Sequence, residues 1–355
     1  MNYFSFFSTL YLFLPLIIQE YNLPEKSIGI IGSLFSLGSV ISGFSLSNFI
    51  EKSKNKNSIT QIIILLNIIL LILLTSVKSY ILLSFIVFMI GYLGSSFVGI
   101  NMSRSQNKGI TIGISSLGFI IGYLLGGMIG NYKTMIFIIS FLFLISLIFS
   151  FVYPIFSKEQ GYEEEKKLNS LEILKKNWFI YLALFLRHTG AAGIWLYFSY
   201  ILLSYYNYNI HIIGILHAIN IIAQTISNPI IYMFVDKKNR SLMLLISTGY
   251  ILSAIYFLFF PMFKNFWILA LLQLILGLSF TALYLGNIEY LSKNNNEKIT
   301  SITLVSSTFS FSNLSGALLS SVMIEKGYIW LFINGFILST LSFFLILLIL
   351  RNQEN

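Results

Sequence analysis

Long apolar stretches follow one another through this chain of 355 residues, and short polar loops separate them. A helix needs roughly 20 apolar residues to cross a hydrocarbon core about 30 Å thick, and it pairs its backbone N–H and C=O groups within itself. The pattern therefore predicts an all-α membrane protein with twelve transmembrane helices. The stretches lie near residues 3–18, 28–49, 59–77, 80–101, 110–130, 134–156, 178–203, 212–235, 241–259, 266–288, 299–324 and 329–350.

Composition narrows the chemistry open to the chain. Apolar residues make up 56% of it and charged residues 10%, a balance that soluble domains do not have. There is no cysteine and there are three histidines, so we expect no disulfide, no metal site and no cofactor. The net charge of +9 could indicate nucleic-acid binding, but the basic residues lie in short loops, where they act as topology signals. We therefore expect contact with membrane lipid and no nucleic acid.

Lysine and arginine are distributed unevenly between alternate loops. Of the 22 Lys and Arg residues, 16 lie in one set of loops and the carboxyl-terminal tail, five lie in the other set, and Arg187 lies within a stretch. Basic loops stay in the cytoplasm. The count predicts a multi-pass protein of the cell membrane (inner or plasma) with both termini in the cytoplasm. The amino terminus has no basic n-region and no cleavage site before Glu20, so we expect the first stretch to be a retained helix.

The longest polar segment divides the chain into two sets of six stretches. It predicts an N-terminal six-helix half at 1–156, a cytoplasmic interdomain linker at 157–177 and a C-terminal six-helix half at 178–355. The end of the linker, LNSLEILKKN, could form a short amphipathic helix on the membrane surface or stay a solvated charged loop.

The two halves repeat each other at an offset of about 185 residues, which indicates duplication and parallel repeats of the kind that form binding sites between halves. The paired residues are Gly29 with Gly214, Glu51-Lys52 with Asp236-Lys237, Gly91 with Gly277, and Asn101 with Asn287.

Two loops at equivalent places in the repeat carry an acidic residue followed by basic ones. They read SNFIEKSKNK after the second stretch and YMFVDKKNRS after the eighth. Both resemble a loop motif of the major facilitator superfamily, in which Asp is followed by basic residues. In the first copy, Glu51 and Lys52 stand at those positions. In the second copy, the positions are held by Asp236, Lys237 and Arg240. The resemblance implies a conformational latch at these residues, and the alternative is that the lysines act only as topology signals.

The fifth stretch carries a glycine pattern that resembles the one found in exporters of that superfamily. Its residues are Gly109, Gly118, Gly122, Gly126 and Gly127. Tyr123 stands where the family pattern has proline, and glycine spacing of this kind also serves close helix packing in lipid. We expect Gly118, Gly122, Gly126 and Gly127 to serve helix packing.

The resemblance covers nearly the whole chain and implies a monomeric secondary transporter that works by alternating access. The leading hypothesis is proton-coupled export of an amphipathic or anionic compound. The alternative is uptake or facilitated diffusion of an organic anion or metabolite, and a more remote one is a receptor or scaffold with the same fold. The chain has no nucleotide-binding loop, no paired carboxylates within a stretch and no metal-ligand spacing, so we expect that the protein is not an enzyme.

Arg187 lies near the middle of the seventh stretch, where an unpaired guanidinium is costly in lipid. One hypothesis is that Arg187, together with His188, binds an anionic group of the solute. The other is that it makes structural hydrogen bonds to a neighbouring helix.

Further polar residues complete the predicted substrate cavity, which in the resembled family is lined by helices 1, 4, 7 and 10. These are Tyr11, Tyr197, Asn101, Gln273, Tyr284 and Asn287. On the eighth stretch, His217, Asn220, Gln224 and Asn228 share one helix face, which favours packing for the amides. No Asp or Glu lies in the middle of a stretch, so His217, His188 or Glu20 would carry a coupling proton, or the protein is a uniporter.

Overall fold

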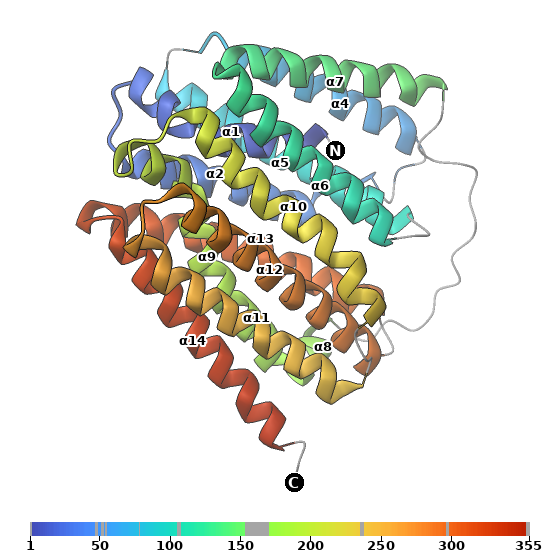
Figure 1. The fold of residues 1–355 in the computed structure, drawn as a ribbon. Coiled ribbons are helices and arrows are strands. Elements are labelled where there is room, and N and C mark those ends of the chain that lie inside the picture. The colour runs from blue at the N-terminus through green and yellow to red at the C-terminus, as the bar shows by residue number, and fades with distance from the viewer. Residues whose placement is uncertain are drawn as a thin grey trace.

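The computed structural model is all-helical, which confirms the predicted fold class at this level. It describes residues 2–46, 49–50, 53, 55–77, 79–104, 108–152, 170–234, 238–295 and 298–352. Figure 1 shows long helices laid side by side in two groups, one from the first part of the chain and one from the second.

The N-terminal group contains α1 (Asn2–Glu20), α2 (Lys26–Phe44), α4 (Lys56–Leu74), α5 (Tyr80–Arg104), α6 (Lys108–Ile129) and α7 (Tyr132–Val152). The C-terminal group contains α8 (Ser170–Lys176), α9 (Trp178–Ser204), α10 (Ile210–Phe234), α11 (Asn239–Phe259), α12 (Phe266–Asn294), α13 (Lys298–Met323) and α14 (Ile329–Asn352). Two short 3-10 turns, η1 (Phe260–Met262) and η2 (Ile324–Lys326), follow α11 and α13.

Within the part of the chain that the structure describes, eight helices are long and apolar enough to cross a membrane: α1, α4, α7, α9, α10, α11, α12 and α14. Shorter apolar segments lie in α2, α5 and α6. Large apolar side chains such as Ile81, Phe234 and Trp267 are more than three-quarters exposed, which fits a surface solvated by lipid. The chain is therefore a multi-pass membrane protein.

The helix α8 lies in the segment predicted to be a linker, and it confirms a short helix at the end of that segment. Ile173 is buried. Lys176 Nζ donates to the backbone oxygen of Asn294 over 2.7 Å, and Asn177 Nδ2 donates to Asn295 Oδ1 over 3.0 Å. These contacts fix α8 to the end of α12.

The sequence repeat recurs in the contacts between helices. A Cβ atom added to Gly91 on α5 would clash with the backbone oxygen of Phe35 on α2. A Cβ atom added to Gly277 on α12 would stand 2.6 Å from the backbone oxygen of Asn220 on α10. Phe35 and Asn220 are separated by the same offset of about 185 residues that relates the two glycines. Equivalent residues therefore make equivalent close contacts in the two groups.

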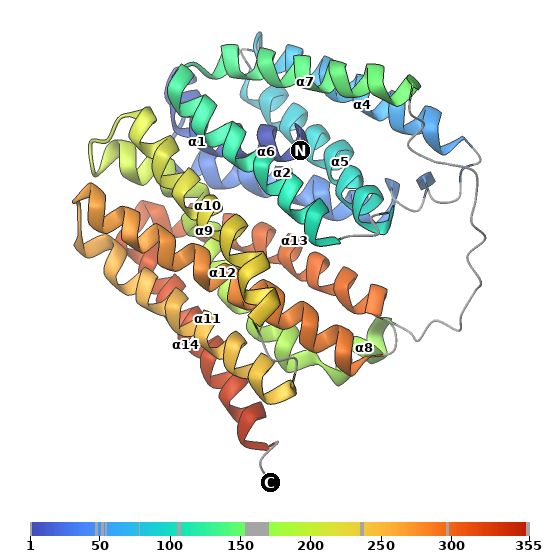
Figure 2. The ribbon, with the colours of Figure 1, turned by 45° about the vertical axis from the view of Figure 1, so that its right-hand side comes forward.

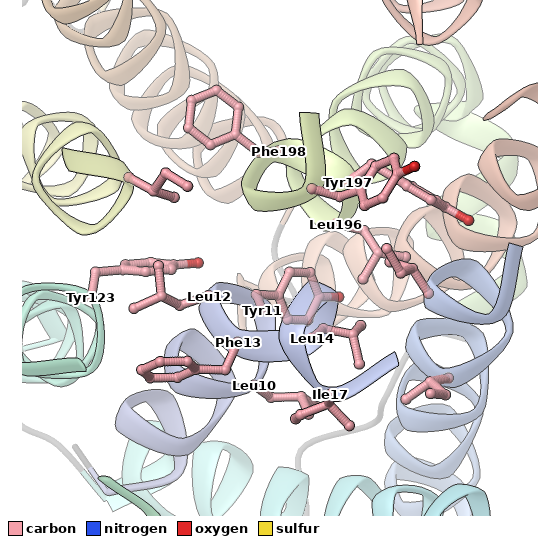
Figure 3. Close-up of a cluster of buried hydrophobic side chains, with 14 of the residues drawn as sticks. Leu10, Tyr11, Leu12, Phe13, Leu14, Ile17, Tyr123, Leu196, Tyr197 and Phe198 are labelled. Atoms are coloured by element: carbon pink, nitrogen blue, oxygen red, sulfur yellow. The ribbon is translucent and has the colours of Figure 1, made fainter. Parts of the chain in front are cut away.

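A cluster of buried apolar side chains lies where the two groups meet. Figure 3 shows Leu12 and Phe13 of α1 on one side, with Tyr123 of α6 beside them and Phe198 of α9 facing them. Since lipid is as apolar as these side chains, their contacts stabilise the fold through close packing rather than through removal from water.

Candidate functional site

The largest contacts between the two groups are those of α2 with α13, α6 with α10 and α1 with α9, and α9 also contacts α2. We use the name closed end for the end of the molecule that carries the α1–α2 and α9–α10 loops. Tyr197, near the end of α9, accepts a hydrogen bond from the Gly29 N–H over 3.0 Å and donates one to the Glu25 backbone oxygen over 3.2 Å. These bonds join α9 to the first turn of α2 at the closed end. Toward the opposite end, the helices of the two groups spread apart (Figure 2).

Two glycines at equivalent places in the repeat allow backbones of different groups to meet at the closed end. A Cβ atom at Gly29 on α2 would stand 2.6 Å from the Ala317 backbone oxygen on α13. A Cβ atom at Gly214 on α10 would stand 2.5 Å from the Tyr123 backbone oxygen and 3.0 Å from Gly127 Cα, both on α6. We call these two contacts the α2–α13 seam and the α6–α10 seam. Each seam requires a residue without a side chain.

His217 is enclosed by rings beside the α6–α10 seam, where it is fully buried. Its ring stacks on Tyr123 of the other group with centroids 4.1 Å apart, and the Trp195 ring meets it edge-on at 4.6 Å. Trp195 Nε1 donates to Tyr123 Oη over 3.0 Å, and Ser199 Oγ lies 3.0 Å from His217 Nε2. Tyr123, which replaces the proline of the exporter pattern, therefore forms part of the contact between groups.

A second set of rings lies in the C-terminal group, around His188. The His188 ring meets Phe309 of α13 edge-on at 4.4 Å and lies 6.3 Å from Phe280 of α12. Phe280 stacks on Tyr284 at 5.7 Å, and Tyr284 lies 5.9 Å from Phe309. All four side chains are half-buried. Three helices therefore bring His188 and Tyr284 together with two phenylalanines that sequence reasoning missed.

Arg187 points away from these rings, into the packing between α9, α11 and α12. It is 2% exposed, and its Nε donates to Ser253 Oγ over 2.8 Å. Its guanidinium also reaches Ser279 Oγ at 3.4 Å, and Ser279 in turn donates to the Gly249 backbone oxygen over 2.7 Å. Among the described residues, Arg187 has no carboxylate within ion-pair distance. This placement matches the predicted structural hydrogen bonds to a neighbouring helix, and the anion-binding role stays a prediction.

Amide side chains of α10 and α12 make hydrogen bonds within the C-terminal group. Asn220 Nδ2 donates to the Gln273 backbone oxygen over 3.1 Å, and Gln224 Nε2 donates to Asn220 Oδ1 over 2.6 Å. Gln273 Nε2 donates to Tyr256 Oη over 3.0 Å. Asn287 is buried, and its Nδ2 donates to the Leu283 backbone oxygen of its own helix over 2.7 Å. These bonds fit the packing role expected for the amides of α10.

Tyr11 and Glu20 lie at different depths of α1. Tyr11 is buried, and its ring stacks on Phe7 with centroids 4.2 Å apart. Glu20 is half-exposed at the closed end, where its carboxylate accepts hydrogen bonds from Lys133 Nζ over 3.0 Å and Tyr132 Oη over 2.8 Å. Glu20 therefore takes part in a surface ion pair within the N-terminal group.

The glycines predicted for helix packing lie on α6, and three of them meet different partners. Cβ atoms added to Gly122 or Gly126 would meet Ser8 or Leu12 of α1, and one added to Gly127 would meet Gly214 of α10. Gly118 is buried.

Several predicted site residues lie wholly or partly outside the described residues. The latch residues Glu51, Lys52, Asp236 and Lys237 lie outside them, whereas Arg240 lies in the first turn of α11. Asn101 lies in α5, but its side chain is not among those that the structure describes.

Comparison with known proteins gives one family match. A family model described as the Major Facilitator Superfamily matches residues 180–355. A search of curated proteins gives no match.

Several solved transporter structures are similar in fold. A mutant form of the nucleoside transporter NupG has a TM-score of 0.79 and 15% identity, over 98% of this chain and 97% of that chain. The human organic anion transporter MFSD10 (TETRAN) has a TM-score of 0.70 and 13% identity, over 97% of both chains. A bacterial homologue of the human lysosomal transporter Spinster, in an inward-facing and unoccupied conformation, has a TM-score of 0.64 and 13% identity, over 98% of this chain and 91% of that chain.

Proposed function

Because the chain belongs to the major facilitator superfamily, we propose that it carries a small organic solute across the cell membrane by alternating access. The observation that carries this proposal is the closed end, where two glycine seams join groups that spread apart at their other ends. A pair of rigid groups that meet at one end can rock to meet at the other, and a solute bound between them then changes sides.

We propose that the two groups are six-helix halves and that all twelve long helices span the membrane. The contacts that recur at the repeat offset, in the seams and at Gly91 and Gly277, support this arrangement. With both termini in the cytoplasm, as the basic loops predict, the closed end faces outward. The structure then corresponds to an inward-open state.

For direction and coupling, we propose export driven by protons, with uptake or facilitated diffusion as the alternative. The glycine pattern of α6 supports export. His217, His188 and Glu20 are the proposed proton carriers, and Asp236, Lys237 and Arg240, with Glu51 and Lys52, the proposed latch of the cytoplasmic end. Efflux and uptake should be compared in proteoliposomes with and without a pH gradient. If the pH gradient changes neither the efflux rate nor the uptake rate, that result would contradict proton coupling.

An organic anion is the second candidate solute. One observation favours it: the buried guanidinium of Arg187 has no carboxylate partner among the described residues. Arginine stays charged and binds carboxylates with paired hydrogen bonds. A change of conformation that breaks the bond between Arg187 and Ser253 would therefore leave the guanidinium free to bind an anionic group of the solute.

Alternating access can be tested by labelling, because the chain has no cysteine of its own. Ala191 lies three residues after His188 and four before Trp195, on the same face of α9. A membrane-impermeant maleimide should label Ala191→Cys from the cytoplasmic side in the inward-open state and from the outside during transport. Labelling that comes from one side only, whatever solute is supplied, would contradict the proposal.

The ion pair between Lys26 Nζ and Glu325 Oε1, 3.1 Å long, joins the two groups at the closed end. Both side chains are half-exposed, and such pairs contribute about 0–1 kcal/mol, so Lys26→Glu should raise outside labelling of Ala191→Cys by at most about fivefold. Adding Glu325→Lys should restore the original rate.

The matched control is the similarly exposed pair of Lys133 and Glu20, which lies within the N-terminal group. Lys133→Glu should leave the labelling rate unchanged. Equal effects of Lys26→Glu and Lys133→Glu would show that the closed end responds to surface charge in general and not to the pair between the groups.

A further inference from the structure

We infer that the rings around His188 form the solute-binding surface and that the solute is a neutral molecule with a planar aromatic ring. This inference rests on the proposed transport function and adds the class of solute to it. The surface consists of His188, Phe280, Tyr284 and Phe309, and we call it the aromatic surface.

The position of the aromatic surface follows from how α9 is turned. Arg187 contacts α11 and α12, while Gly190 and Gly193 lie against α14 and α13. His188 shares its helix face with Trp195, seven residues further on, and Trp195 contacts Tyr123 of the N-terminal group. The face of α9 that carries His188 is therefore the one that faces the other group, and behind it Tyr284 and Phe309 pack against a buried apolar cluster of the C-terminal group.

The chemistry of the aromatic surface fits a flat and uncharged partner. Four half-buried rings on three helices have centroids 4.4–6.3 Å apart, so a further planar ring can stack on them or meet them edge-on. The one charged side chain in the middle of α9, Arg187, is bonded to Ser253 and points elsewhere. An anion placed on the rings would meet their negative faces without a compensating cation.

One hydrogen-bonding group at the surface has no partner. His188 Nδ1 is buried without a hydrogen-bond partner among the described residues. A neutral imidazole has one donor and one acceptor nitrogen, so a solute with an amide or a similar group could satisfy Nδ1 while its ring stacks on Phe309. The solute class is therefore an aromatic ring that carries an uncharged polar group.

Three probes of nearly equal size separate the alternatives: benzamide, its saturated analogue cyclohexanecarboxamide and its anionic analogue benzoate. Binding to the purified protein is measured from the concentration dependence of the shift in melting temperature. We expect benzamide to stabilise the protein and to bind at least about tenfold more tightly than cyclohexanecarboxamide, because only benzamide has a ring that can stack. We expect no stabilisation by benzoate.

Variants of single residues then test whether benzamide binds at the aromatic surface. Phe309→Ala should weaken benzamide binding by about three- to tenfold, whereas Phe344→Ala, on the exposed side of α14, should leave it unchanged. If Phe309→Ala fails to fold, Phe309→Leu removes the ring and keeps most of the volume. His188→Leu should abolish the preference for benzamide over toluene, which lacks the polar group.

The inference is overturned if cyclohexanecarboxamide binds as tightly as benzamide, or if Phe309→Ala and Phe309→Leu both bind benzamide like the wild type. Stabilisation by benzoate that is lost in Arg187→Met would assign the site to the organic-anion candidate. Each of these results leaves transport itself intact. Labelling of Ala191→Cys from one side only would contradict the proposed function, whichever probe binds.

Discussion

Gly214→Leu is expected to stop the two groups from meeting at the closed end and to reduce transport by about ten- to hundredfold. A side chain at this position would meet the Tyr123 backbone oxygen at 2.5 Å and Gly127 Cα at 3.0 Å, and backbone atoms cannot turn away as a flexible side chain can. Forcing extra atoms into a packed contact costs about 1–3 kcal/mol, and this cost applies only to the state in which the seam is closed.

The measurement is the rate at which the impermeant maleimide labels Ala191→Cys from each side of the membrane. Gly214→Leu should raise outside labelling and lower cytoplasmic labelling. Ile215→Ala is the control, because Ile215 is the next residue along α10 and is 41% exposed. A Gly214→Leu protein that folds, transports and labels like the wild type would show that the α6–α10 seam does not limit closure.

Arg187→Ala is expected to destabilise the protein by about 2–5 kcal/mol, through the cavity left by a buried side chain and the loss of its hydrogen bonds to Ser253 and Ser279. Arg187→Met should keep most of the stability, because replacing a buried charge by an apolar side chain of similar volume is often neutral or stabilising. Melting temperatures in one detergent give both comparisons.

Transport by Arg187→Met separates the two roles weighed for this residue. We expect the variant to retain transport, because the guanidinium in this structure bonds α9 to α11 and α12 and not to the neighbouring group. A variant that melts like the wild type and transports nothing would instead place Arg187 at the solute. If Ser253→Ala and Ser279→Ala both keep transport, that result would also support a role for Arg187 at the solute.

The sequence predicts where the helices of this fold lie along the chain. It does not predict how each helix is rotated about its own axis, and so which side chains face which neighbour. Arg187 and His188 are adjacent, and their depth in the membrane follows from helix geometry. Adjacent residues differ by about 100° around the axis, so one faces α11 and the other faces Phe309. A soluble helix reveals its inner face by an apolar stripe, whereas α9 is apolar on every side because lipid replaces water outside.

The ring cluster at the closed end shows a second limit. Tyr123, Trp195 and His217 come from three helices and two groups, and no local pattern links them. One signal in the sequence could have indicated this contact: Tyr123 occupies a position at which the family pattern has proline, next to glycines. The repeat offset was more informative, since Gly29 and Gly214, paired in the sequence alone, both lie in seams between the groups.

The pairing of the two seams bears on the kinetics of the transport cycle. The α2–α13 and α6–α10 contacts are built from residues at equivalent places in the repeat, and the proposed rocking motion opens both of them together. Separation at the closed end is therefore a single cooperative event with one free-energy barrier. Half-separated species should be too short-lived to accumulate, so a fluorophore on either seam should report one exponential phase with one common rate constant.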